Sequence, residues 1–215
     1  MRKENRRNFC AAACMLLAFL LWTAAVKCMD VRAIGPRGST VGFAALNQFV
    51  HHLTGVHMAL YTVTDWLGLV PIAFALGFAI LGLVQWISRK SIRRVDRSIL
   101  MLGGFYLAVL AAFLFFEEWV VNYRPVLIEG VLEASYPSST TLLVLCVMST
   151  AIFQLSFRMK KSTLRRFVLG MLSAFTVFMV MGRLVSGVHW FTDIAGGVLL
   201  SAGLVLLYVA FSESE

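Results

Sequence analysis

The chain has 215 residues, of which 60% are hydrophobic and 14% are charged, and its mean hydropathy is +0.82. A water-soluble domain usually has about 25% charged residues and about 45–50% apolar residues. The composition therefore excludes a disordered chain and an ordinary soluble enzyme, and it indicates an integral membrane protein. The net charge of +8 would by itself suit nucleic-acid binding, but the positions of the basic residues instead indicate the orientation of the chain in the membrane.

Apolar stretches recur along the whole chain. A helix that crosses a bilayer needs about 20 mostly apolar residues. These stretches are apolar on all sides, as expected for helices that face lipid or the centre of a bundle. The predicted fold is therefore all-α, a polytopic membrane protein with six transmembrane helices in a bundle. The predicted spans are residues 9–26, 66–87, 98–116, 141–157, 167–181 and 194–211.

The first stretch also has features of a secretory signal peptide, because basic residues precede an apolar run that ends near Thr23, Ala24 and Ala25. We expect it to remain as a transmembrane helix, since the run is long and no clean small-x-small cleavage site follows it. Cleavage is the alternative, and it would leave the next segment on the same side of the membrane.

Fourteen of the nineteen Lys and Arg residues lie before the first span, between the second and third, and between the fourth and fifth. The positive-inside rule makes these segments cytoplasmic. Both termini are then expected in the cytoplasm of a multi-pass cell-membrane protein, and no nucleic-acid partner is needed to explain the charge. The fourteen residues are Arg2, Lys3, Arg6, Arg7, Arg89, Lys90, Arg93, Arg94, Arg97, Arg158, Lys160, Lys161, Arg165 and Arg166.

A long segment joins the first two spans on the predicted outer side. Its Gly and Pro residues predict a turn at 35–39, and the stretch 41–61 is too polar to span, so it predicts an interfacial or re-entrant amphipathic helix. The histidines of this stretch lack the i, i+4 spacing of a helical metal site, and the four cysteines lack metal-binding spacing. We therefore expect no metal and no cofactor. The histidines are His51, His52 and His57.

The expected organisation has three parts. An N-terminal transmembrane helix occupies residues 1–28, and the extracytoplasmic segment with its interfacial helix occupies residues 29–65. A membrane core of five transmembrane helices occupies residues 66–212.

Two of the four arginines predicted on the outer side, Arg124 and Arg183, lie just past the ends of predicted spans. A single Arg at the end of an apolar helix often only extends to the lipid headgroups, and that alternative applies to each of them separately. Two Arg residues on one face are better explained by an anion, because each guanidinium presents forked donors that fit two phosphate oxygens.

Two further segments accompany these arginines. Tyr136 and Pro137 lead into Ser138, which indicates a helix start with Pro in the first turn and hydroxyl groups as caps. Such an end offers N–H groups and a positive dipole to an anion. His189 and Asp193 are four residues apart and would share a helix face. Asp193 could then accept from one ring nitrogen, fix the tautomer and leave the other nitrogen free to attack phosphorus.

These segments resemble the type 2 phosphatidic acid phosphatase/haloperoxidase superfamily, in its membrane-embedded lipid phosphatase branch. Arg124-Pro125 matches the end of the first family signature, Lys-x6-Arg-Pro, and Pro137-Ser138 matches the start of the second, Pro-Ser-Gly-His. The order, the separations and the six-span layout are similar as well. The resemblance covers roughly residues 66–211.

The third family signature, Ser-Arg-x5-His-x3-Asp, is matched in both spacings by Arg183, His189 and Asp193. The resemblance implies that His189 is the nucleophile, forming a phosphohistidine, and that Asp193 orients it. The residues that it implies for phosphate binding are Arg124, Ser138, Ser139 and Arg183. Thr140, Tyr136 and His57 are expected to be auxiliary residues at the site.

The chain departs from the signatures at three positions. Glu117 stands in place of the first Lys, Gly182 in place of the Ser before Arg183, and Thr140 in place of the His that protonates the leaving group. A Thr hydroxyl cannot act as a general acid near pH 7. The departure favours substrates whose leaving group needs little protonation, unless His52 or His57 supplies the proton.

The expected function is hydrolysis of a lipid phosphate or polyprenyl diphosphate at the extracytoplasmic membrane surface, with a membrane lipid as the substrate. Two alternatives remain open. One is a non-catalytic protein that binds or transports a lipid phosphate, and the other is a lipid phosphotransferase.

Overall fold

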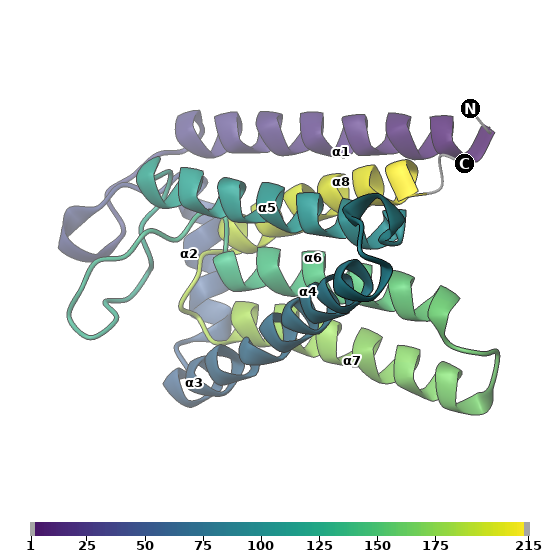
Figure 1. Ribbon diagram of the computed structural model, residues 1–215. Coiled ribbons are helices and arrows are strands. Elements are labelled where there is room, and N and C mark those ends of the chain that lie inside the picture. The colour runs from purple at the N-terminus through teal and green to yellow at the C-terminus, as the bar shows by residue number, and fades with distance from the viewer. Residues whose placement is uncertain (1–2, 213–215) are drawn as a thin grey trace.

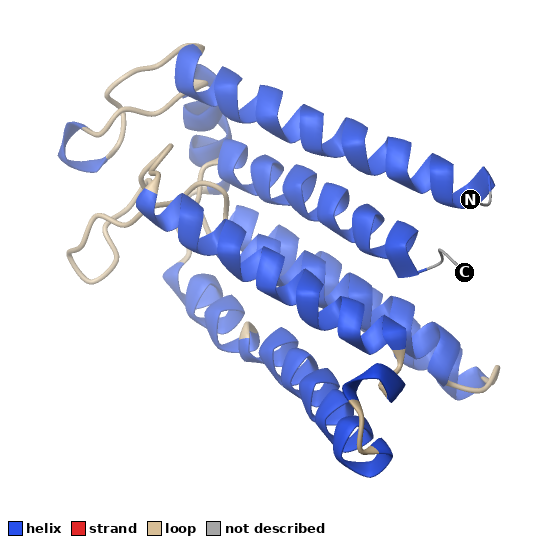
Figure 2. Cartoon of the chain, turned by 45° about the horizontal axis from the view of Figure 1, so that its top comes forward, coloured by secondary structure: helices blue, strands red, loops and turns tan. Residues whose placement is uncertain are grey.

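The computed structural model describes residues 3–212, and within that range the regular structure is helical, with isolated β-bridges in the loops (Figures 1 and 2). Of the basic residues before the first span, Arg2 lies outside the described range. The elements are α1 (Lys3–Cys28), η1 (Pro36–Gly38), α2 (Ala44–Thr54), α3 (Met58–Leu67), α4 (Leu69–Arg89), η2 (Ile92–Arg94), α5 (Arg97–Glu118), α6 (Ser139–Arg158), α7 (Thr163–Val185) and α8 (Phe191–Ser212).

Six candidate membrane spans are found among the described residues, and five of them coincide with α1, α5, α6, α7 and α8. The remaining one, Met58–Arg89, joins α3 to α4 across Gly68. The predicted six-span, all-helical fold is therefore confirmed, and the protein is a multi-pass membrane protein. The long helices run alongside one another, so that their connecting loops gather at the two ends of the bundle (Figure 2).

The most buried span is α6, which packs against α4, α5, α7 and α8. On the other side of α8 lies α1, which follows it along the bundle (Figure 1). This approach is close, because a Cβ atom on Gly203 would lie 2.7 Å from Leu16 Cδ2. The first and last spans are therefore neighbours in space.

The stretch predicted as one amphipathic helix over residues 41–61 contains two. The helix α2 ends at Thr54, and α3 begins at Met58 and leads toward α4. The break falls at Gly55, whose φ of +68° is a conformation that residues with a Cβ rarely adopt. The single-helix expectation is therefore wrong, and the second helix brings Tyr61 over the end of the bundle.

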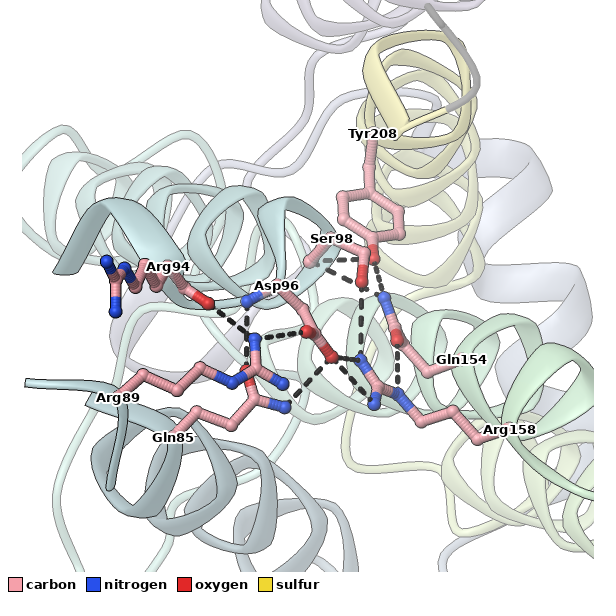
Figure 3. Close-up of polar contacts among 8 residues, drawn as sticks. All are labelled: Gln85, Arg89, Arg94, Asp96, Ser98, Gln154, Arg158 and Tyr208. Carbon is pink, nitrogen blue, oxygen red and sulfur yellow. Dashed lines mark hydrogen bonds and ion pairs between the residues drawn. The ribbon is translucent and has the colours of Figure 1, made fainter. Parts of the chain in front are cut away.

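One end of the bundle is closed by a polar cluster around Asp96, which we call the basic-end cluster (Figure 3). The Asp96 carboxylate accepts from Gln85 and Arg89 of α4, each at 2.9 Å, and from both terminal nitrogens of Arg158 at 3.2 Å. Helices α4 and α6 are thereby joined to the start of α5. The cluster comprises Gln85, Arg89, Arg94, Asp96, Ser98, Gln154, Arg158 and Tyr208.

Candidate active site

The opposite end of the bundle, which we call the site end, brings together four residues that the sequence separates. Arg124 follows α5, Arg183 lies in the last turn of α7, His189 precedes α8, and Asp193 lies in the first turn of α8. Their relative exposures are 7%, 1%, 3% and 0% in that order. Arginines buried to this degree do not extend to the lipid headgroups.

The loop after α5 doubles back as an irregular hairpin. The Arg124 N–H donates to the Glu133 carbonyl at 3.1 Å, and the Ser135 N–H donates to the Asn122 carbonyl at 2.9 Å. Residues two apart on an extended strand point to the same face. This alternation explains why Asn122 and Arg124 both face the segment that carries His189.

Both ring nitrogens of His189 are engaged. Its Nε2 lies 3.2 Å from Arg124 Nη1, and its Nδ1 lies 2.9 Å from Ser135 Oγ. Ser135 Oγ in turn donates to Asp193 Oδ2 at 2.5 Å. The expected direct contact between His189 and Asp193 is therefore wrong in its detail. His189 lies in a turn before α8, so the helical-face argument does not apply, and Ser135 occupies the space between the two side chains.

The Asp193 carboxylate is surrounded by donors. Besides Ser135, it accepts from Asn122 Nδ2 at 3.1 Å and from the Trp190 N–H at 3.0 Å. The neighbouring Thr192 is held by Asn47 of α2, which donates to its hydroxyl at 2.9 Å and accepts from its N–H at 3.1 Å. An ionised carboxylate only accepts hydrogen bonds, and these partners all donate to it.

The two arginines lie against one aromatic ring. The Tyr61 centroid is 4.8 Å from Arg183 Cζ and 5.9 Å from Arg124 Cζ. Each guanidinium also has an acidic partner on a loop or helix end: Arg124 Nε is 2.9 Å from Glu133 Oε2, and Arg183 Nη1 is 3.6 Å from Asp65 Oδ1. Two adjacent cations at a partly closed site attract an anion with more than one negative oxygen.

Packing accounts for one departure from the family signature. A Cβ atom on Gly182 would lie 2.8 Å from Thr64 Cγ2, because α3 packs against α7 at this point. The Ser that the family carries there would therefore crowd Thr64. The close approach of α3 is also what brings Tyr61 to Arg183.

Ser138 is the N-cap of α6. Its hydroxyl accepts from the Thr141 N–H at 3.4 Å, and its N–H donates to the Asp193 carbonyl at 3.1 Å. Pro137 precedes this cap and lies two residues before the first helical residue, so the expectation that it lies in the first turn is wrong. The first residues of α6 are Ser139 and Thr140, and the N–H groups of a first helical turn have no partner within the helix.

The auxiliary residues lie in different surroundings. The Tyr136 hydroxyl is 2.7 Å from Thr23 Oγ1, so it ties α6 to α1. The exposed His57 ring donates through Nε2 to the Thr54 carbonyl at 2.9 Å. Burial lowers the pKa of His51, whose ring lies 5.4 Å from that of Trp190. In the described part of the chain, no group of three His, Cys, Asp or Glu side chains is placed to hold a metal ion.

Burial, with the charges of Arg124 and Arg183, lowers the pKa of His189 well below its ordinary value. The ring is therefore neutral at neutral pH, so one of its nitrogens carries a lone pair. Sequence reasoning missed four residues of this site, Ser135, Tyr61, Asn47 and Asn122. The site partners of Ser135 are 54 or more residues away in the sequence, and the partner of Asn47 is 145 residues away. Local spacing in the sequence therefore gives no sign of these contacts.

No protein-family model matches the chain, and no curated protein matches it in sequence. Among solved structures, the model is similar to a crystal structure of a transmembrane PAP2 type phosphatidylglycerolphosphate phosphatase from Bacillus subtilis. The similarity covers 94% of this chain and 96% of that chain, with a TM-score of 0.61 and 21% sequence identity. This chain has the fold of a transmembrane PAP2-type phosphatase. With 21% identical residues, the similarity shows a shared fold. The buried site around His189 is part of that fold in this chain.

Proposed function

We propose that the protein is an integral membrane phosphatase that hydrolyses a lipid phosphate or polyprenyl diphosphate through a phosphohistidine on His189. The observation that carries the proposal is the 3.2 Å contact between Arg124 Nη1 and His189 Nε2. An anion that accepts from Arg124 Nη1 in place of His189 would free the Nε2 lone pair and place its phosphorus beside that ring nitrogen. Membership of the PAP2 superfamily, which the motif spacings and the fold support, is part of the proposal.

In the proposed reaction, Arg124 and Arg183 bind the phosphate oxygens, and the open N–H groups at the start of α6 add to them. His189 Nε2 attacks phosphorus, so that a P–N bond forms and the bond from phosphorus to the leaving oxygen breaks. The leaving group departs with that electron pair. Water then cleaves the P–N bond, which releases phosphate and restores the neutral ring.

A lipid substrate is supported by an apolar cavity of about 420 Å³ between α4, α5 and α6. Its site-end wall contains Ser139 and Thr140, so a hydrocarbon chain in the cavity would meet the start of α6. A second cavity of about 320 Å³ continues between α4 and α5 and shares Ala75 and Tyr106 with the first. We propose that the lipid tail lies along these cavities, with the site on the extracytoplasmic side.

Thr140 indicates which kind of leaving group the site can expel. An alkoxide that leaves a phosphate monoester needs a proton, whereas the phosphate that leaves a diphosphate is already stable as an anion near pH 7. Because general-acid catalysis is worth roughly 10²–10⁴-fold, a site with Thr140 in place of His loses most on monoesters. We therefore propose a diphosphate as the preferred substrate.

The test measures phosphate release from a panel of lipid monophosphates and polyprenyl diphosphates by the purified protein in detergent or lipid. We expect turnover of diphosphates above monoesters, loss of all turnover in His189→Ala, and an acid-labile phosphoenzyme in the wild type. Binding without release would favour the lipid-phosphate-binding alternative. Turnover that depends on an added acceptor would favour the phosphotransferase.

A second variant tests the leaving-group argument. Thr140→His should raise monoester turnover more than diphosphate turnover, since it restores an acid at the start of α6. A wild type that prefers monoesters and is indifferent to Thr140→His would contradict the diphosphate proposal while leaving the phosphatase proposal intact.

A further inference from the structure

Ser135 lies where a catalytic histidine and its carboxylate partner would otherwise touch. It is 3% exposed, and its hydroxyl is hydrogen bonded to both His189 Nδ1 and Asp193 Oδ2. Ser135 lies on the same hairpin as Arg124, and its N–H donates to the Asn122 carbonyl. The hydroxyl is therefore fixed by backbone geometry and not only by its two side-chain partners.

The direction of each hydrogen bond follows from what the end groups can do. A guanidinium has donors and no acceptor, so Arg124 Nη1 must donate to His189 Nε2. A neutral imidazole carries one proton, which is then on Nδ1. That N–H donates to Ser135 Oγ, and the single hydroxyl proton of Ser135 is left to donate to Asp193.

The partners of the Asp193 carboxylate give the same hydrogen-bond directions independently. Asp193 Oδ2 also accepts from the Trp190 N–H, and Oδ1 accepts from Asn122, so an ionised Asp193 needs Ser135 as a donor. Both arguments give the same donors: Arg124 donates to His189, His189 donates to Ser135, and Ser135 donates to Asp193. One arrangement satisfies every group.

We propose that Ser135 is a positioning residue that, together with Arg124 at the other ring nitrogen, holds His189 as the Nδ1–H tautomer and couples its ring to Asp193. The inference deepens the proposed phosphatase function and rests on it for its catalytic consequence. When Nε2 bonds to phosphorus, the ring gains a positive charge. The Nδ1 proton can then move to Ser135 Oγ while the Ser135 proton moves to Asp193 Oδ2, which leaves a neutral phosphohistidine, a serine hydroxyl and a carboxylic acid.

The first experiment reads the tautomer and needs no activity. The ring nitrogen shifts of ¹⁵N-histidine-labelled protein are recorded, and His189 is assigned by comparison with His189→Ala. We expect a protonated Nδ1 and an unprotonated Nε2 in the wild type, a changed tautomer balance in Ser135→Ala, and recovery in Ser135→Thr. A wild-type ring protonated at Nε2, or unchanged shifts in Ser135→Ala, would overturn the proposal.

The second experiment measures the rate of phosphoenzyme formation in Ser135→Ala, Asp193→Asn and the double variant. We expect each single change to slow the step by roughly 10²-fold or more, as loss of the required tautomer does in other histidine-dependent sites. The double variant should be no slower than the slower single variant, because residues in one network are not additive. Additive losses would show that Ser135 acts apart from Asp193, against the proposal.

Ser201→Ala is the matched control. It removes a buried hydroxyl that donates to the Gly197 carbonyl within α8 and lies outside the site. Its nitrogen shifts and phosphoenzyme rate should equal those of the wild type. A wild type that forms no phosphoenzyme would refute the proposed function, while the nitrogen shifts would still decide the role of Ser135.

Discussion

At the scale of single residues, the site places two like charges side by side and keeps them from water. The Arg124 and Arg183 guanidinium groups both lie near the Tyr61 ring. Glu133 and Asp65 balance their charges only in part, because these two side chains are 40% and 58% exposed. A phosphate with two negative oxygens would balance the pair more closely than these carboxylates do. The arrangement therefore favours a dianionic group over a single carboxylate.

We predict that Arg124→Lys and Arg183→Lys each impair turnover while the bundle stays folded. Lysine keeps the charge but loses the planar fork, and each charge-assisted hydrogen bond is worth about 1.5–3 kcal/mol, or roughly 10- to 150-fold in rate. Steady-state phosphate release measures the loss, and thermal unfolding in detergent checks the fold.

Arg37→Lys is the matched control for these two variants, because Arg37 is exposed and its Nη2 donates to the Gly130 carbonyl at 2.9 Å, away from His189. It should behave as the wild type. Near wild-type turnover in both Arg124→Lys and Arg183→Lys would show that neither guanidinium binds the substrate phosphate through its fork.

Three of the site residues that the sequence indicated lie at a fixed local spacing. Arg183, His189 and Asp193 lie within a few turns of one another and carry a recognisable pattern. Ser135 could not be recognised in the same way, because its role depends on a hairpin that brings it to residues 54 and 58 positions away. The roles of all these residues stay predictions until variants are measured.

At the scale of elements, the turn between α7 and α8 determines where His189 lies. Gly187 in this turn has φ of +68°, and a Cβ atom on it would lie 1.8 Å from the Gly55 carbonyl oxygen. The N–H of His57 donates to the Ser186 carbonyl at 2.9 Å, so the break between α2 and α3 is docked on the same turn. The segment between α1 and α4 thus braces the loop that carries His189.

We predict that Gly187→Ala lowers turnover by about 10²-fold or more. The left-handed conformation costs an L-residue roughly 1–2 kcal/mol, the clash is with backbone that must shift, and a displacement of about 1 Å at a reacting group can cost 10²-fold. Phosphate release and thermal unfolding are the measurements.

Gly170→Ala on α7 is the control for Gly187→Ala, since a Cβ atom there meets nothing within 4 Å. It should leave both turnover and unfolding temperature near the wild-type values. If Gly187→Ala were as active as Gly170→Ala, the turn would tolerate a shift and would not determine the position of His189.

The elements themselves were predictable to different degrees. Long apolar runs marked the six spans, because a membrane helix must be apolar over its whole length. The stretch 41–61 was mistaken for one helix because its mean polarity hides the break at Gly55, which becomes visible only through its φ and its contact with Gly187. The division of the chain at residues 28 and 65 stays a prediction.

At the scale of the whole molecule, the basic-end cluster ties helices together far from the site. Hydrogen bonds from Gln85 and then Arg89, together with Arg158, lower the pKa of Asp96 below its ordinary value. A carboxyl with a lowered pKa in the folded state stabilises that state above its ordinary pKa of about 4, and the contribution is lost as the pH falls toward the lower folded value.

We predict that Asp96→Asn lowers the unfolding temperature at pH 7, and that the difference from the wild type narrows as the pH falls below about 4. Thermal unfolding over a pH series measures this. Turnover at temperatures well below unfolding should change little, since the cluster lies at the other end of the bundle.

Glu129→Gln, at the exposed tip of the site-end hairpin, is the control for the loss of a carboxylate by itself. Its unfolding temperature should follow the wild-type curve at every pH. A constant difference between Asp96→Asn and the wild type down to pH 3 would show that the carboxylate charge is not what joins these helices.

The contact between α1 and α8 affects when, during synthesis, the bundle can be completed. Trp22 Nε1 donates to the Thr192 carbonyl at 3.1 Å, beside Asp193, and Thr23 is bonded to Tyr136 before α6. Among the described spans, the one that is synthesised first therefore packs against the one that is synthesised last. Four other described spans lie between them in the sequence, so the face of α1 that meets α8 has no partner until α8 has been made. His189 and Asp193 likewise follow the other five spans in the chain. Under the proposed function, a fragment that ends before His189 would lack the group that attacks phosphorus, and we expect it to be inactive however well its other helices insert.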